Sequence, residues 1–175
     1  MNMIGEVAAG LLLARLIIGL GLASHGAQKL FGWFGGHGLR GTGQAFDGVG
    51  FRPGTFFAVS AGLAEVGGGL LTALGLLGAI GPALIVMVML VAVLAVHLKN
   101  GFSMANNGWE LCGLYIAGAL GLAFGGFGAY SLDGALGLTM LSTPQITWLL
   151  MGAAVVLAFL NLAVRRPAPQ PLGEV

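Results

Sequence analysis

Long apolar segments, separated by short polar or glycine-rich stretches, dominate this chain. The hydrocarbon core of a bilayer is about 30 Å thick, and about 20 helical residues cross it. Five segments approach or reach that length, which predicts an all-α polytopic transmembrane bundle over residues 1–164 and a basic, proline-rich cytoplasmic tail over residues 165–175. We expect transmembrane helices at about residues 7–30, 55–77, 81–98, 109–125 and 145–164.

Composition supports a membrane protein. Apolar residues make up 57% of the chain and charged residues 7%, whereas soluble domains carry about 25% charged residues. This leaves too little polar surface to cover a soluble globule, so the lipid bilayer is the first expected partner. A net charge of +1 argues against nucleic acid as a partner. Cys112 is the single cysteine, which excludes an internal disulfide.

The basic residues predict the orientation. Loops on the cytoplasmic side of membrane proteins carry an excess of Lys and Arg. With five helices and the N-terminus outside, the basic residues near the helix ends all fall inside, and the outer segments hold none. We therefore expect an N-terminus outside, a C-terminus inside and a multi-pass protein of a bacterial-type cytoplasmic (inner) membrane. The inner basic residues are Lys29, Arg40, Arg52, Lys99, Arg165 and Arg166.

Two ionisable residues, Arg15 and Glu65, fall near the middle of apolar segments. Intramembrane charges are costly, and they mark functional positions by default. At 1.5 Å per residue, Arg15 lies about 12 Å below the outer start of the first helix and Glu65 about 18 Å below the outer end of the second. We expect the two side chains to form an ion pair. The pair is either a structural clip or a site in which Glu65 carries a proton or contacts a ligand.

A second polar group is predicted near the inner ends of the helices. His25 and Lys29 are four residues apart and share a helix face. His97 ends the third predicted helix, and Glu110 begins the fourth. Together they outline a polar pocket, although both histidines could also be interfacial and Lys29 a simple topology determinant. The resulting candidates are Glu65 and Glu110 as catalytic residues and Arg15, His25, Lys29 and His97 as substrate- or cofactor-binding residues.

Two other patterns have local interpretations. We expect residues 31–54 to be irregular and partly re-entrant, with Trp33, Phe34, Phe46 and Phe51 near the lipid headgroups. Residues 36–41 formally match a dinucleotide-binding fingerprint, but the strand that this motif requires is not predicted. Glycines in the second helix predict close helix packing, namely Gly67, Gly68, Gly69, Gly75 and Gly78.

Several of these residues together resemble the DoxX-like family of small integral membrane proteins. The resemblance rests on Arg15, the stretch SHGAQKLFG at residues 24–32, Glu65 with its following glycines, the region of His97, Glu110 and Asp133. It covers about residues 8–135 and implies a four-helix core, so that the helix at residues 145–164 is an extension. It also implies a membrane-embedded subunit linked to redox systems, including quinone-coupled thiosulfate oxidation and thiol or oxidative-stress partners.

The leading functional hypothesis is a membrane subunit of a quinone-linked oxidoreductase, with a polar intramembrane pocket for a quinone or a small anionic substrate. One alternative is a non-catalytic membrane anchor or scaffold for a soluble redox or stress-response partner. Another is a small-molecule or ion carrier. A redox protein partner and a homo-oligomer are both compatible with the sequence. We expect no metal site and no haem, although His25 and His97 are the residues that could supply axial ligands.

Overall fold

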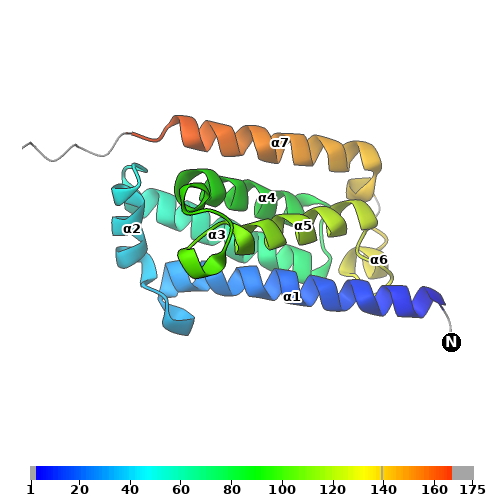
Figure 1. Cartoon of the computed structure of the whole chain (residues 1–175). Helices are drawn as coiled ribbons and strands as arrows, with labels where there is room; N and C mark the ends of the chain where they lie inside the picture. The colour runs from blue at the N-terminus through cyan, green and yellow to red at the C-terminus, as the bar shows by residue number, and fades with distance from the viewer. Residues whose placement is uncertain (1–2, 139, 167–175) are drawn as a thin grey trace, which may run out of the picture.

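The computed structural model describes residues 3–138 and 140–166, and every regular element within them is helical (Figure 1). This confirms the prediction of an all-α protein. The proline-rich segment predicted after Arg166 lies outside the described residues. The long helices are α1 (Met3–Phe31), α3 (Gly54–Leu74), α4 (Ile80–Ala92), α5 (Glu110–Gly125) and α7 (Pro144–Ala163). The short helical elements are η1 (Trp33–Gly35), α2 (Gly38–Gly48), η2 (Val93–His97), η3 (Leu98–Asn100), η4 (Met104–Asn106), α6 (Leu132–Leu136) and η5 (Met140–Ser142).

Four helical stretches are long and apolar enough to cross a membrane. They are Gly5–Phe31, Gly54–Leu74, Ile80–Asn100 and Pro144–Ala163. The fourth predicted segment, residues 109–125, forms α5, which has 16 residues and is therefore about 24 Å long. Figure 1 shows α2 and the end of α7 at one end of the bundle, and α6 at the other. This agrees with the prediction that residues 31–54 and the C-terminus lie on the same side of the bundle. Which of the two sides faces the cytoplasm stays a prediction.

Close backbone contact joins α1 to α3. A Cβ atom added to Gly69 would lie 2.7 Å from the backbone nitrogen of Ala23, and one added to Gly26 would lie 2.7 Å from the carbonyl oxygen of Gly62. Small residues allow membrane helices to approach this closely. Gly68 packs similarly against α4, where an added Cβ would meet the side chain of Leu84. Packing glycines were thus correctly predicted at positions 68 and 69.

The end of α3 differs from the prediction, because the helix stops at Leu74 rather than at residue 77. Gly75 adopts a left-handed conformation (φ 63°) and caps the helix, and Gly78 has φ 55° in the following turn. Left-handed backbone is costly for residues with a Cβ atom, so glycine is favoured at such positions. Gly75 and Gly78 therefore shape a turn beyond the helix, but they are also closely packed, because an added Cβ would meet the Arg15 guanidinium at Gly75 and the carbonyl of Leu141 at Gly78. Nothing lies within 4 Å of a Cβ placed on Gly67, so the predicted packing role is wrong at that glycine.

Residues 31–54 are more ordered than predicted, because 11 of them form α2, which lies across one end of the bundle (Figure 1). Phe51 is 2% exposed and packs against Phe57, with ring centroids 5.2 Å apart. The expected place of Phe51 at the headgroups is therefore wrong. Asp47 accepts a hydrogen bond from the backbone nitrogen of Gly54 (2.8 Å), which satisfies a free donor at the start of α3.

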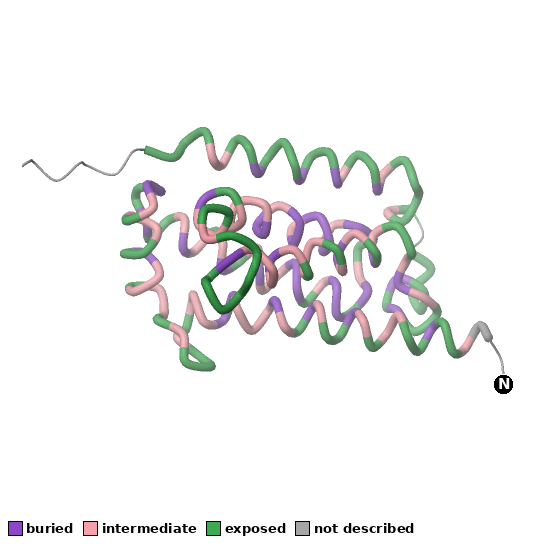
Figure 2. The backbone as a smooth tube through the Cα atoms, in the orientation of Figure 1, coloured by how far each residue is buried: buried purple, intermediate pink, exposed green. Residues whose placement is uncertain are grey.

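The last helix, α7, packs mainly on α4. Its buried residues recur every three or four positions, whereas the rest of its surface is largely exposed (Figure 2). An apolar face of this kind suits contact with lipid tails. At its end, the backbone nitrogen of Arg166 donates to the carbonyl of Gly50 (2.8 Å), and the Arg165 side chain donates to the carbonyl of Val49. These contacts tie α7 to the turn after α2.

Candidate binding cavity

Arg15 does not pair with Glu65, so the predicted ion pair is wrong. The Arg15 side chain is buried, and its guanidinium donates to the carbonyl oxygens of Tyr130 (2.7 Å) and Leu74 (3.4 Å). It also lies over the ring of Phe127, 5.9 Å from the centroid. Arg15 therefore links the middle of α1 to the end of α3 and to the segment before α6.

The error arose from helix register. The predicted pair requires α1 and α3 to begin and end at the same outer plane. In the structure, Gly26 lies against Gly62 and Val66 of the antiparallel helix, which places residues near 25 at the level of Glu65. Arg15 is 10 residues from that level, or about 15 Å along the helix. Small-residue contacts set this register, and the sequence alone does not identify which glycines face each other.

Lys29 is the actual partner of Glu65. Its Nζ atom lies 2.7 Å from Oε1 and 2.5 Å from Oε2 of the carboxylate. The Glu65 side chain is 4% exposed and that of Lys29 is 27% exposed, so the pair extends from the interior to an accessible edge. A buried carboxylate without a partner would be costly, and the ammonium group removes much of that cost.

His25 lies one helical turn before Lys29. Its Nδ1 atom is 2.9 Å from Oε1 of Gln28, and its ring meets that of Tyr115 edge-on, with centroids 5.9 Å apart. The amide nitrogen of Gln28 in turn donates to the carbonyl of Phe34 (3.3 Å). Because an amide oxygen only accepts, Nδ1 carries the hydrogen. In a neutral ring, Nε2 is then the hydrogen-bond acceptor.

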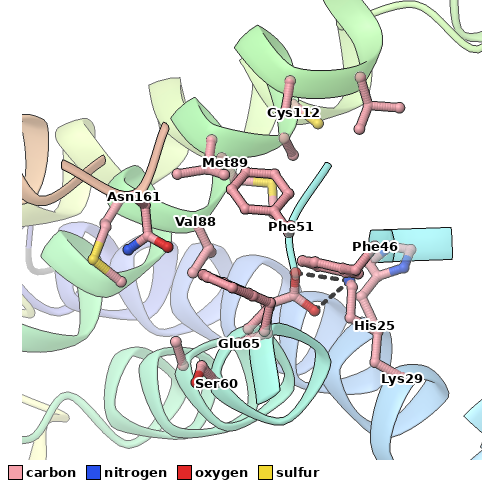
Figure 3. Close-up of a pocket in the computed structure, with 18 of the residues that line it drawn as sticks. His25, Lys29, Phe46, Phe51, Ser60, Glu65, Val88, Met89, Cys112 and Asn161 are labelled. Carbon is pink, nitrogen blue, oxygen red and sulfur yellow. Dashed lines mark hydrogen bonds and ion pairs between the residues drawn. The ribbon is translucent and has the colours of Figure 1, made fainter. Parts of the chain in front are cut away.

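A cavity of about 450 Å³ lies beside these residues (Figure 3). Its walls come from α1, α2, α3, α4, η2, α5 and α7, and most of the lining side chains are apolar. His25, Lys29 and Glu65 form a polar part of the wall, with Lys29 and Glu65 as its ion pair, and aromatic side chains from α2 and the following turn lie nearby. His97 also lines the cavity, so the structure brings together four of the six predicted site residues.

His97 lies at the end of the π-helical turn η2, and its Nδ1 atom is 2.8 Å from the carbonyl oxygen of Asn107. Such π-helical turns occur frequently at functional sites.

The other two predicted residues do not line the cavity. The Glu110 carboxylate accepts a hydrogen bond from the backbone nitrogen of Met104 (2.9 Å). Arg15 is likewise absent from the lining.

Two lining residues were not predicted from the sequence, namely Cys112 of α5 and Asn161 of α7. Cys112 was considered only for disulfides. For Tyr115 of α5, the sequence leaves open whether it lines this pocket or only packs, and in the structure it lines the cavity. Asn161 carried a usable signal, because a polar side chain inside an apolar segment is a default functional candidate.

Comparison with known proteins agrees with the resemblance seen in the sequence. A model of the DoxX family matches residues 10–98, which is 89 of 175 residues. The chain belongs to the DoxX family. With its apolar helices, this DoxX protein is a membrane protein. No curated protein and no solved structure matches the chain.

The DoxX match covers α1 from Gly10 onward, contains α2, α3 and α4, and ends at Leu98. His25, Lys29, Glu65 and His97 therefore belong to the matched part. The remaining walls of the cavity come from α5 and α7, beyond its end. The charged part of the wall thus belongs to the family segment, and two of the enclosing helices do not.

Proposed function

We propose that this DoxX protein is a membrane-embedded subunit of a quinone-linked oxidoreductase system, in which the cavity binds the quinone ring. The observation that carries the proposal is the buried Lys29–Glu65 pair in the wall of a largely apolar cavity. Small-molecule sites typically combine apolar walls with a few precisely placed polar groups. The proposed location is a bacterial-type cytoplasmic membrane.

The properties of the wall fit a quinone. A quinone ring is flat and apolar, and its carbonyl oxygens accept hydrogen bonds. Val88 and Met89 supply apolar surface, and the cavity volume of about 450 Å³ falls within the usual range for ligand sites. The Lys29 ammonium has three N–H donors, and it donates two of them to the oxygens of Glu65. One donor therefore remains for a ligand carbonyl.

The same residues can handle protons. A bound quinone would supply two-electron chemistry coupled to two protons. Glu65 and His25 both face the cavity, and each can hold and release a proton within reach of a ligand. Lys29 keeps the Glu65 carboxylate oriented by bonding both of its oxygens. Lys29 is partly exposed and lies near the end of α1, so a proton route to solvent could pass along this pair.

The electrons would come from a protein partner. With Cys112 as its single cysteine, one chain has no dithiol that could relay an electron pair. In this scheme the membrane protein provides the quinone site, and a soluble redox protein provides the reducing equivalents. A stable soluble partner is thus part of the proposal.

Solvent extraction of the purified protein, followed by mass analysis of the extract, tests this function. We expect a quinone in amounts that approach one per chain. A second preparation of the Glu65→Gln variant should contain much less. Protein that copurifies with a soluble redox partner but carries no quinone, and binds none when it is added, would contradict the proposal and favour a membrane scaffold. Flux of a solute into proteoliposomes would favour a carrier.

A further inference from the structure

Helix α7 closes the cavity on the side of the bundle opposite α1 (Figure 1). The residue that α7 contributes to the lining is Asn161, in the last turn of the helix. Figure 3 shows the Asn161 amide on one side of the cavity, with His25 and Lys29 on the other. The cavity therefore has polar groups at two separate places, joined by apolar walls.

The Asn161 amide is available to a ligand. Among the described residues, no hydrogen bond to protein involves its side chain, and its polar atoms are not fully buried. Asn161 is half-buried in the wall of the cavity. A polar group of the ligand can therefore reach the amide.

From this arrangement we infer that α7 supplies a second binding pole, Asn161, and that the ligand is a ring with oxygen atoms at both ends. This inference rests on the proposed quinone function and narrows its ligand class. One oxygen would face Lys29 and the other would face Asn161. An asparagine amide both donates and accepts, so it suits a carbonyl and a hydroxyl alike.

A 1,4-quinone and its hydroquinone meet this requirement, since their oxygens lie on opposite edges of the ring. A small anion with its charge concentrated at one end would bond Lys29 and leave Asn161 without a partner. The two-pole arrangement therefore favours the quinone among the ligands considered for this cavity. It also assigns a specific role to α7, which lies beyond the segment matched by the DoxX family.

Two probes separate the poles, namely a decyl-substituted 1,4-hydroquinone and the matching decylphenol, which lacks one oxygen. Calorimetric titration of the full chain in detergent, without air, measures both affinities. We expect the wild-type protein to bind the hydroquinone more tightly. Asn161→Ala should weaken hydroquinone binding about three- to tenfold, the size of one hydrogen bond, and should leave phenol binding unchanged.

Three further variants and the wild type provide controls. Asn106→Ala removes an exposed amide in η4, away from the cavity, and should change neither affinity. Leu160→Ala tests the exposed side of the same turn of α7 and should behave likewise. Asn161→Gln keeps an amide and should retain part of the preference for hydroquinone. Thermal unfolding shows whether Asn161→Ala is folded, and Asn161→Gln provides the test if it is not.

The outcomes separate this inference from the function on which it rests. Equal weakening of both probes by Asn161→Ala, or no weakening of either, would overturn the second pole and leave the quinone site standing. The same holds if the wild-type protein binds both probes equally well. Failure of the wild-type protein to bind either probe would overturn the quinone function, and the second pole with it.

Discussion

At the scale of single residues, the cavity depends on how Lys29 and Glu65 share a buried environment. Lys29 lies near the end of α1, so its long side chain reaches inward to the carboxylate while its backbone stays close to the bundle end. Lysine side chains commonly bury the apolar stem while placing the charge elsewhere. The result is a carboxylate with a fixed orientation at the edge of an apolar cavity.

Glu65→Gln tests the proposed role of this carboxylate. Glutamine keeps the shape and can still accept a hydrogen bond from Lys29, so the protein should insert and fold. It cannot take up a proton, and quinone-dependent turnover should fall at least about a hundredfold, the lower end of the effect of a general acid–base group. The measurement is quinone reduction by membranes that contain the variant and the redox partner.

Glu110→Gln is the matched control for that experiment. The Glu110 carboxylate holds the backbone of Met104 in the loop before α5 and is absent from the cavity lining. We expect its turnover to stay within about twofold of wild type, because no acid–base group of the cavity changes. Comparable losses in the two variants would remove the distinction that the structure draws between them.

Arg15 gives a different expectation, since its contacts are structural. Arg15→Met should lower the free energy of unfolding by roughly 2–3 kcal/mol, because the carbonyls of Tyr130 and Leu74 lose a charged donor. Ligand affinity of the folded variant should stay unchanged. Thermal unfolding in detergent and calorimetric titration provide the two measurements. Arg40→Met, at an exposed position of α2, is the control.

At the scale of helices, the α1–α3 contact makes a clear prediction. Gly69→Ala places a methyl group against the backbone of Gly19 and Ala23, and the crowding should destabilise the protein by about 1–3 kcal/mol. Gly67→Ala makes the same chemical change where nothing lies within 4 Å. It should be neutral or stabilise by up to about 1 kcal/mol through helix propensity. Melting temperatures of the two variants, compared in one detergent, decide the matter.

Helix positions were predictable because each apolar segment is long and carries few charges, and four of them have the length of a membrane crossing. Of the polar group predicted near the inner helix ends, His25, Lys29 and His97 line one cavity, whereas Glu110 does not, and Glu65 lines this cavity rather than pairing with Arg15. The partner of Glu65 was not predictable, because pairing depends on which glycines of α1 and α3 touch. The same information decides that Arg15 reaches Tyr130, a residue far along the chain.

Local helix ends were equally hard to predict. Gly75 and Gly78 continue the glycine pattern of the second helix, but they form a turn after it. The Asp133 carboxylate stabilises this turn by accepting hydrogen bonds from the backbone nitrogens of Leu77 (2.9 Å) and Gly78 (2.6 Å). Only tertiary structure brings Asp133 to this turn. The sequence places Asp133 after the fourth predicted helix, with no indication of its partner.

At the scale of the whole molecule, orientation in the membrane is the main prediction. The single cysteine, Cys112, can be replaced by serine so that new cysteines report on each side. Leu136→Cys, in exposed α6, should react with a membrane-impermeant maleimide on intact cells. Asn106→Cys, in exposed η4, should react only after the membrane is permeabilised. The reverse pattern would contradict an outer N-terminus.

The contrast between the two sides of the bundle has a mechanical consequence. Backbone-to-backbone contact fixes α1 against α3, so these two helices cannot move apart without losing their closest packing. In contrast, α7 packs mainly on α4, and hydrogen bonds from Arg165 and Arg166 attach its end to the turn after α2. The α1–α3 half of the protein therefore forms a rigid frame for the cavity. Because the attachment lies within five residues of Asn161, the α7 wall is also held in place where it borders the cavity.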